Sequence, residues 1–145
     1  MRLWPLSLAL LAPTVVAAQP IDRSPAAARA LVQRYYAAID RGDYRAAYRS
    51  WDRGGAASGQ SLARFTQGFA RTAHSRVRTG APTDGEGAAG SAFVTVPVHV
   101  DATLKNGAHR HFAGSYILRR VNDIDGATAD QLSWHIASAS LKPVR

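Results

Sequence analysis

The spacing of apolar residues changes near His74, and this change constrains the fold more than any other feature of the chain. Before His74, apolar residues recur every three or four positions, which is the spacing of one helix face; after it they alternate, as in a strand. The alternation is plainest at Val94, Val96, Val98 and Val100, which fall on one face. Helices followed by antiparallel strands predict an α+β domain in which the helices cover one sheet face.

The first predicted helix has clear signals at both ends. Ser24 is a favourable N-cap, Pro25 suits the first helical position, and Gly42 provides the stop. Its apolar stripe contains Leu31, Val32, Tyr35, Tyr36 and Ile39. A helix beginning at Pro25 is therefore expected to bury one broad face.

Two shorter helices are predicted to follow. Asp43 caps the second, which is expected to end at Gly54-Gly55, and the third is expected over residues 61–73. The buried face of the second contains Tyr44, Ala47, Tyr48 and Trp51, and that of the third contains Leu62, Phe65 and Phe69. The arginines at 41, 45, 49 and 53 recur every four residues, so we expect them on one solvated helix face, with anion binding as the functional alternative.

The second half predicts an antiparallel meander. A first strand is expected over 75–81, a turn-rich loop over 82–90, and a long strand from Ala92 in which Pro97 indicates an edge or a bulge. After a polar connection over 122–130, the last strand is expected to open at Leu132 and run to about Lys142. The sheet should therefore have about four strands.

Asn106-Gly107 predicts a hairpin, whose register depends on the loop length. A two-residue loop pairs Leu104 with His109 and places the valines opposite the face of Phe112, Gly114, Tyr116 and Leu118. A three-residue loop, Asn106 to Ala108, pairs Val98 with Tyr116 and Val96 with Leu118. We favour the three-residue loop, because it places the valines and the aromatic residues on one face.

The first residues are typical of a secretion signal. Arg2 precedes an apolar run from Leu3 to Leu11, and small residues end at Ala18. Signal peptidase reads this order, and the run is too short to span a membrane as a helix. We expect residues 1–18 to be removed and residues 19–145 to form a single exported domain, periplasmic or secreted, with no stable membrane insertion.

The composition excludes cysteine chemistry and shows an excess of basic residues. The chain has no cysteine, so it forms neither disulfides nor a lipid-modified cysteine. Its formal net charge is +8, and from Arg23 to Arg78 eleven arginines face three aspartates. For an exported domain we expect no nucleic-acid partner, and we interpret this charge as a solvated surface.

Two stretches resemble a known superfamily. The run Ile39-Asp40-Arg41-Gly42-Asp43-Tyr44, with the aromatic residues that follow, is similar to the helix-turn-helix that opens domains of the nuclear transport factor 2-like superfamily, which includes SnoaL-like and ketosteroid isomerase-like domains. Residues 116–120 and 134–136 resemble its last two strands. The resemblance implies a cystatin-like α+β roll, in which a curved sheet around a long helix forms a cone with an apolar pocket, often in a homodimer.

The resemblance implies a fold and leaves the function open, because this superfamily includes isomerases, dehydratases, cyclases, transport factors and exported domains with no assigned role. The expected pocket lining is aromatic: Tyr35, Tyr48, Trp51, Phe69, Tyr116 and Trp134. The enzymes of the superfamily carry an acid or base pair there, whereas Asp101 falls on the outer face in the favoured register. We therefore expect a noncatalytic domain that binds a small apolar or aromatic ligand or an envelope partner, without a cofactor. An isomerase or dehydratase, and a surface-acting domain with a filled core, are the alternatives.

The other motifs are weaker candidates for a site. Gly85, Gly87 and Gly90 have the spacing of a dinucleotide-binding loop, but a strand follows where a helix is needed. His109 and His111 share a strand face without a third metal ligand, because His99 is expected four strand positions from His111. His99 and Asp101 have the spacing of a base and its orienting carboxylate. Ser115 lies within a strand, away from the sharp turn that a serine nucleophile requires.

Overall fold

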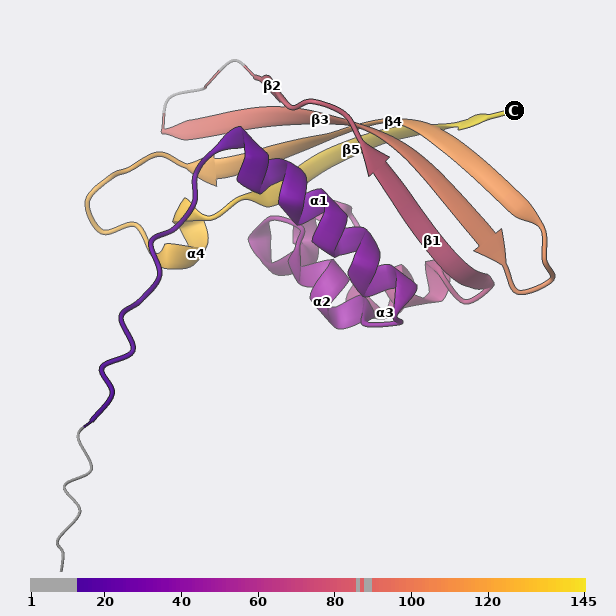
Figure 1. Ribbon diagram of the computed structural model, residues 1–145, viewed down its shortest axis with the longest axis horizontal. Coiled ribbons are helices and arrows are strands. Elements are labelled where there is room, and N and C mark those ends of the chain that lie inside the picture. The colour runs from indigo at the N-terminus through magenta and orange to yellow at the C-terminus, as the bar shows by residue number, and fades with distance from the viewer. Residues whose placement is uncertain (1–12, 86, 88–89) are drawn as a thin grey trace, which may run out of the picture.

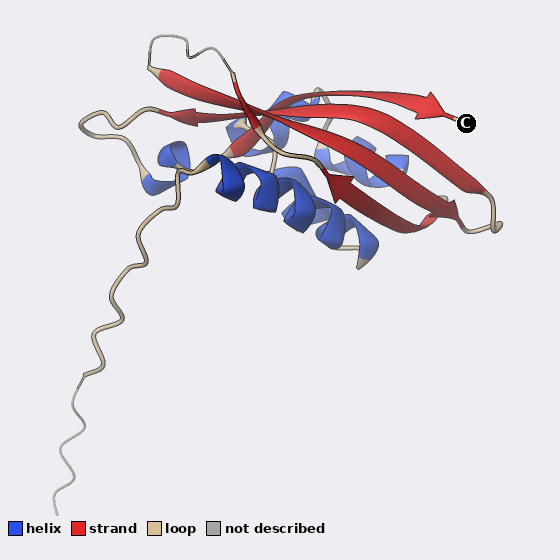
Figure 2. Ribbon diagram, turned by 45° about the horizontal axis from the view of Figure 1, so that its top comes forward, coloured by secondary structure: helices blue, strands red, loops and turns tan. Residues whose placement is uncertain are grey.

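The fold is α+β, with three N-terminal helices packed on one face of a curved antiparallel sheet (Figures 1 and 2). The computed structural model describes residues 13–85, 87 and 90–145. The helices are α1 (Pro25–Asp40), α2 (Tyr44–Arg49), the 3-10 helix η1 (Arg53–Ser58), α3 (Leu62–Gly68) and α4 (Ala129–Leu132). The strands are β1 (Thr72–Thr79), β2 (Thr83–Asp84), β3 (Ser91–Leu104), β4 (His109–Val121) and β5 (His135–Val144).

The expected fold class is confirmed. The strand order is β1-β3-β4-β5, and the short β2 pairs with β3 beyond the end of β1. The predicted secretion signal lies largely outside the described residues; residues 13–20 are exposed and form neither helix nor strand. No helix in the described part of the chain is long and apolar enough to cross a membrane.

Helix α1 forms as its end signals predict. The Ser24 hydroxyl accepts a hydrogen bond from the Ala27 amide, Pro25 is the first helical residue, and Gly42 follows the helix with a φ of +77°. The buried face contains Ala28, Val32, Tyr35, Tyr36, Ala38 and Ile39. This face places two adjacent tyrosines against the sheet.

The second helix is shorter than predicted. Asp43 caps it as expected, but it ends at Arg49, because the next backbone groups pair with β5. The Ile136 amide donates to the Ser50 carbonyl, and the Asp52 amide donates to the Ile136 carbonyl, so Trp51 forms an isolated bridge with Ile136. The expected end at Gly54-Gly55 was therefore wrong.

This early end also breaks up the predicted arginine stripe. Arg41 caps α1, Arg45 and Arg49 lie on α2, and Arg53 lies in η1 with a φ of +55°. Four-residue spacing places residues on one face only while the helix continues. The prediction of a single helix face was therefore wrong.

Further boundaries of helices and strands differ from the prediction. Helix α3 ends at Gly68, not near residue 73, because Thr72 already pairs with Leu104, and β1 ends at Thr79. Leu132 lies in α4, which a capping box between Thr128 and Gln131 starts, so the last strand begins later than predicted, at His135. The prediction missed α4 because a single helical turn has no apolar period to detect.

The hairpin has a three-residue loop, but it begins one residue earlier than predicted. The loop is Lys105-Asn106-Gly107, closed by a hydrogen bond from the Leu104 amide to the Ala108 carbonyl. Gly107 has a φ of +85°, and such loops place the left-handed residue last. Val96 therefore pairs with Tyr116, whereas the prediction paired Val98 with it. The shift is two positions, so the valines still share the inner face with Tyr116 and Leu118.

Pro97 lies in a central strand, so its interpretation as a mark of an edge or a bulge was wrong. Strand β1 stops pairing with β3 at Val98, and β2 begins to pair at Thr95. Pro97 occupies the gap between them, where its missing N–H removes no bond from either short ladder.

The core lies between α1 and the inner sheet face. Its strand residues are Val94, Val96, Val98, Val100, Tyr116, Leu118 and Ile136, each at most 4% exposed. Aromatic rings fill the space below them: the Tyr35 ring lies 5.8 Å from the Tyr116 ring and 6.3 Å from the Trp51 ring, centroid to centroid. This packing closes one half of the inner face and leaves the half near the hairpin open.

Candidate functional site

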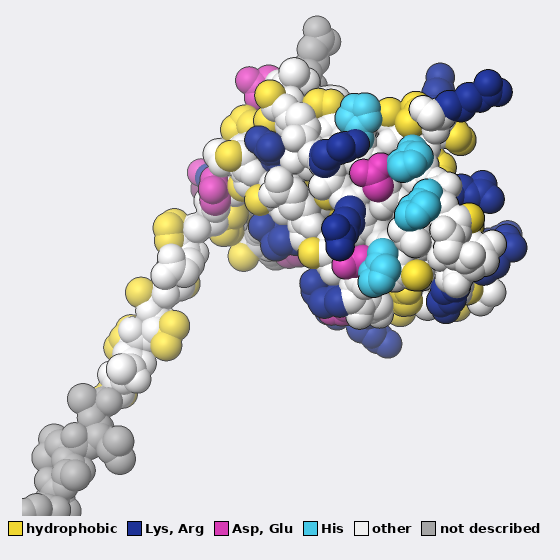
Figure 3. All heavy atoms as spheres, turned by 45° about the vertical axis from the view of Figure 1, so that its right-hand side comes forward, with side chains coloured by type: hydrophobic (Ala, Val, Ile, Leu, Met, Phe, Trp, Pro, Cys, Tyr) yellow, Lys and Arg dark blue, Asp and Glu magenta, His cyan; other side chains and the backbone are white. Residues whose placement is uncertain are grey.

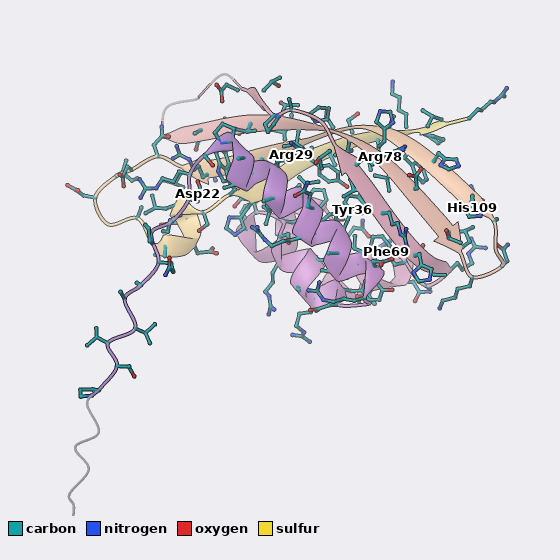
Figure 4. The ribbon with its side chains drawn as sticks, viewed as in Figure 1. Asp22, Arg29, Tyr36, Phe69, Arg78 and His109 are labelled. Atoms are coloured by element: carbon teal, nitrogen blue, oxygen red, sulfur yellow. The ribbon has the colours of Figure 1, made fainter. Side chains whose placement is uncertain are left out.

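A cavity of about 350 Å³ opens on the inner face of the sheet at the hairpin end. Its walls come from the C-terminal half of α1, from the end of α3, and from the facing ends of β1, β3, β4 and β5. Figure 4 places Tyr36 and Phe69 at this end of the molecule, whereas Asp22 and Arg29 lie toward the opposite end. The cavity exists because β3 and β4 extend beyond the helices that cover the rest of the sheet.

Most of the lining is apolar. Phe69, Val100, Phe112 and Leu141 are among its walls, and Phe69 also stacks on Tyr44 with centroids 5.6 Å apart. This lining contains no carboxylate and no imidazole, and its single charged residue is Arg110, near the hairpin. Such a lining, with few polar groups, is typical of sites for small apolar ligands.

Two tyrosines meet at the wall of the cavity. The Tyr36 and Tyr116 hydroxyl oxygens lie 2.6 Å apart, and both residues are at most 5% exposed. Burial raises the pKa of both phenols above the ordinary value, and it raises the pKa of neighbouring Tyr35 to about 12. All three tyrosines are therefore protonated near neutral pH and act there as hydrogen-bond donors or acceptors without charge.

The Tyr36–Tyr116 hydrogen bond gives a direct test of this site. We expect Tyr116→Phe to lower the free energy of unfolding by about 1–2 kcal/mol, because the Tyr36 hydroxyl loses its buried partner. Replacing both tyrosines by phenylalanine should cost less than the sum of the two single changes, because neither variant side chain leaves an unpaired hydroxyl. Urea denaturation of the four proteins measures this coupling; strictly additive costs would show that the two hydroxyls do not interact.

The expected pocket residues separate into those that line the cavity and those that lie outside it. Tyr35, Phe69 and Tyr116 line the cavity. Trp51 lies behind it, with its ring centroid 6.4 Å from that of Tyr116. Tyr48 packs on Phe65 and donates a hydrogen bond to the Gln60 carbonyl.

Trp134 lies apart from this cavity. Its indole N–H donates to the Ser24 carbonyl over 3.0 Å, and the Arg120 guanidinium sits 5.2 Å from the ring centroid. The Trp134 ring thus holds the start of α1 against the end of the sheet opposite the hairpin. The sequence predicts that Trp134 lies on an inner face, but alternation alone does not determine how far along the sheet it lies.

Several lining residues were absent from the predicted set. Tyr36 and Phe112 were assigned to inward faces without being assigned to the pocket. Ser75, Ala102 and Arg110 were not singled out, because only the β1–β3–β4 register brings them together. Alternation from Phe112 back to Arg110 was the one available signal that Arg110 faces inward.

The outer sheet face is polar and basic (Figure 3). Asp101 pairs there with His111, whose Nδ1 lies 2.6 Å from the carboxylate, and with Arg78 at 3.6 Å. The His111 hydrogen bond, aided by Arg78, lowers the pKa of Asp101. His111 thus takes the place beside Asp101 that the prediction gave to His99, which pairs instead with Ala113. This arrangement is an exposed ion-pair cluster.

The register corrects the expected spacing of the histidines. His111 pairs with Asp101 and His99 pairs with Ala113, so the two histidines are two strand positions apart, not four. The described residues nevertheless contain no group of three histidine or acidic side chains arranged to hold a metal ion. His109 lies on the same face, with Nδ1 3.4 Å from the Thr103 hydroxyl.

The remaining motifs have structural roles within the described residues. Gly90, the last glycine of the Gly85-Gly87-Gly90 spacing, is followed directly by β3, so no helix N-terminus is present to bind a pyrophosphate. Residues 86 and 88–89 of that loop lie outside the described part. Ser115 pairs with Pro97 and Ser140 in the middle of β4.

The chain folds as an α+β domain with an open, largely apolar cavity between its curved sheet and its helices. No protein-family model, no curated protein and no solved structure matches this chain.

Proposed function

We propose that this domain binds a small apolar or aromatic molecule in the cavity, without transforming it. The observation that carries the proposal is the open cavity of about 350 Å³ beside an otherwise filled aromatic core. Its volume lies within the range of small-molecule sites, and its apolar walls contribute binding energy through the hydrophobic effect.

The chemistry of the lining supports binding over proton transfer. A general base needs a pKa near the working pH, and histidine or a carboxylate usually supplies it. The cavity lining has neither, and burial raises the pKa of its three tyrosines. The tyrosine hydroxyls of Tyr36 and Tyr116 instead provide neutral polar contacts that orient a ligand.

We also propose that the domain is an exported member of the nuclear transport factor 2-like superfamily. The support is the packing of α1 to α3 on a curved antiparallel sheet, with an apolar pocket at its open end. The secretion-type sequence of residues 1–18 supports a periplasmic or secreted location. A homodimer, which the resemblance implies, is part of this proposal.

Trp51 provides the readout for ligand binding. Its ring contacts Tyr35 and Tyr116, which line the cavity. We expect 1-decanol and butylbenzene to cause a saturable change in tryptophan emission, with a roughly micromolar dissociation constant for the tighter ligand. Selective excitation of tryptophan during a titration measures it.

Replacing either of two alanines with phenylalanine makes the test specific. Ala102 lines the cavity from β3, and Ala113 lies in β4 on the outer face. Ala102→Phe should fill the cavity and weaken binding at least about tenfold. A tenfold loss of affinity corresponds to about 1.4 kcal/mol of binding free energy. Ala113→Phe adds the same ring and should bind normally. The absence of a saturable response in the wild type, or an equal loss in both variants, would reject the pocket as the binding site.

A further inference from the structure

Three inner-face residues form a row across three strands at the mouth of the cavity. Ser75 of β1 pairs with Ala102 of β3, and Ala102 pairs with Arg110 of β4. All three line the cavity. Strands lie about 4.8 Å apart, so the Cα atoms of Ser75 and Arg110 are about 10 Å apart with only a methyl group between them. The row therefore has a serine side chain at one end and an arginine side chain at the other.

Both polar groups are available to a ligand. Among the described residues, the exposed Arg110 makes no ion pair and no side-chain hydrogen bond, whereas the less exposed Arg23, Arg29 and Arg119 do. Ser75 is 5% exposed, and its hydroxyl makes no hydrogen bond to the described residues, whereas its amide donates to Asp40 over 2.9 Å. The guanidinium offers a fork of donors that matches a carboxylate.

The nearest acidic groups are already engaged. The Asp40 carboxylate accepts from the Ser75 amide and lies 3.2 Å from His74 Nδ1, and it does not line the cavity. Asp101 lies on the opposite sheet face, paired with His111 and Arg78. The cavity thus combines apolar walls with one cation and no anion of its own.

We propose that the ligand is an amphipathic carboxylate, whose anionic group lies over Ala102 between Arg110 and Ser75 and whose apolar part fills the cavity. This inference rests on the proposed function, because it names the chemical class of the same ligand. The carboxylate accepts hydrogen bonds from the Arg110 guanidinium and the Ser75 hydroxyl. The apolar chain then extends toward Phe112 and the Tyr36–Tyr116 pair.

Three ligands that share a ten-carbon chain and differ in their head group test the proposal. Decanoate, 1-decanol and decyltrimethylammonium are titrated at neutral pH with tryptophan emission as the readout. Arg110 is exposed at the mouth, so we expect a moderate preference: decanoate about fivefold to tenfold tighter than decanol, and the cation weaker than decanol. Raising the salt concentration should reduce this preference and leave decanol binding unchanged.

Substitutions then locate the head group. Arg110→Gln should reduce the ratio of decanoate to decanol affinity to about one, Arg110→Lys should restore part of it, and Ser75→Ala should lower it by about twofold to threefold. Arg45→Gln is the matched control: it removes the same charge from an exposed position on α2 and should leave the ratio unchanged.

The outcomes separate the two proposals. Equal affinities of decanoate and decanol for the wild type would overturn the carboxylate inference and leave the apolar pocket standing. A ratio that falls equally in Arg110→Gln and Arg45→Gln would also overturn it, because net charge alone would then explain the preference. Binding of none of the three ligands would reject the proposed function itself.

Discussion

Replacing Gly114 with alanine is expected to destabilise the domain by about 3 kcal/mol or more. Gly114 lies in β4 between β3 and β5, and a Cβ at this position would lie 1.8 Å from the Ser140 carbonyl oxygen of β5. Because the obstacle is backbone, no side chain can rotate away, and the strands must separate or shift. Overpacking of this kind costs about 1–3 kcal/mol or more. Urea denaturation followed by circular dichroism measures the loss.

Gly68→Ala provides the control for this prediction. Gly68 ends α3, its added Cβ would meet no atom within 4 Å, and its φ is not positive. Alanine favours helices by up to about 1 kcal/mol over glycine, so this variant should be as stable as the wild type or slightly more stable. Similar stability of the Gly114→Ala and Gly68→Ala variants would show that β4 and β5 do not approach each other as described.

The buried tyrosines should make the domain unfold in alkali. An unfolded tyrosine has a pKa near 10, whereas burial raises the pKa of Tyr35 to about 12 and raises those of Tyr36 and Tyr116 as well. Between these values the unfolded chain binds fewer protons than the folded one, so the free energy of unfolding falls as pH rises. The contribution is complete below pH 10. Three such groups give a slope of about 4 kcal/mol per pH unit near pH 11.

Denaturation curves at several pH values from neutral to pH 11.5 measure this slope. The double variant Tyr36→Phe, Tyr116→Phe retains only Tyr35 of the three and should lose stability about one third as steeply. An unchanged slope in the double variant would assign the alkaline transition to other groups. The coupling between Tyr36 and Tyr116, measured at neutral pH, provides an independent check on the same pair.

Helix α1 and the inner valine face were predictable because each depends on local signals. Ser24, Pro25 and Gly42 mark the ends of α1, and alternation alone places Val94 to Val100 on one side of a strand. The α+β class followed from their order. Errors arose where a distant segment decides a boundary: α2 ends because the backbone around Trp51 bonds to Ile136, more than 80 residues later.

The site was predictable only in part for the same reason. Tyr35, Phe69 and Tyr116 were expected in the pocket because aromatic residues on inner faces tend to meet. The row of Ser75, Ala102 and Arg110 depends on two strand registers, and the predicted hairpin register was two positions off. A face can be derived from alternation, whereas a position along that face requires the turn geometry.

The contacts between the two ends of the domain have a consequence for biosynthesis. Trp134 bonds to the Ser24 carbonyl at the start of α1, and Ile136 of β5 bonds on both sides of Trp51. Without β5, the helical half therefore has no partner for the Trp51 segment, and the inner sheet face is incomplete. A chain emerging from the ribosome therefore cannot close its core until β5 has left the exit tunnel, and the helices and the earlier strands stay incompletely packed until then.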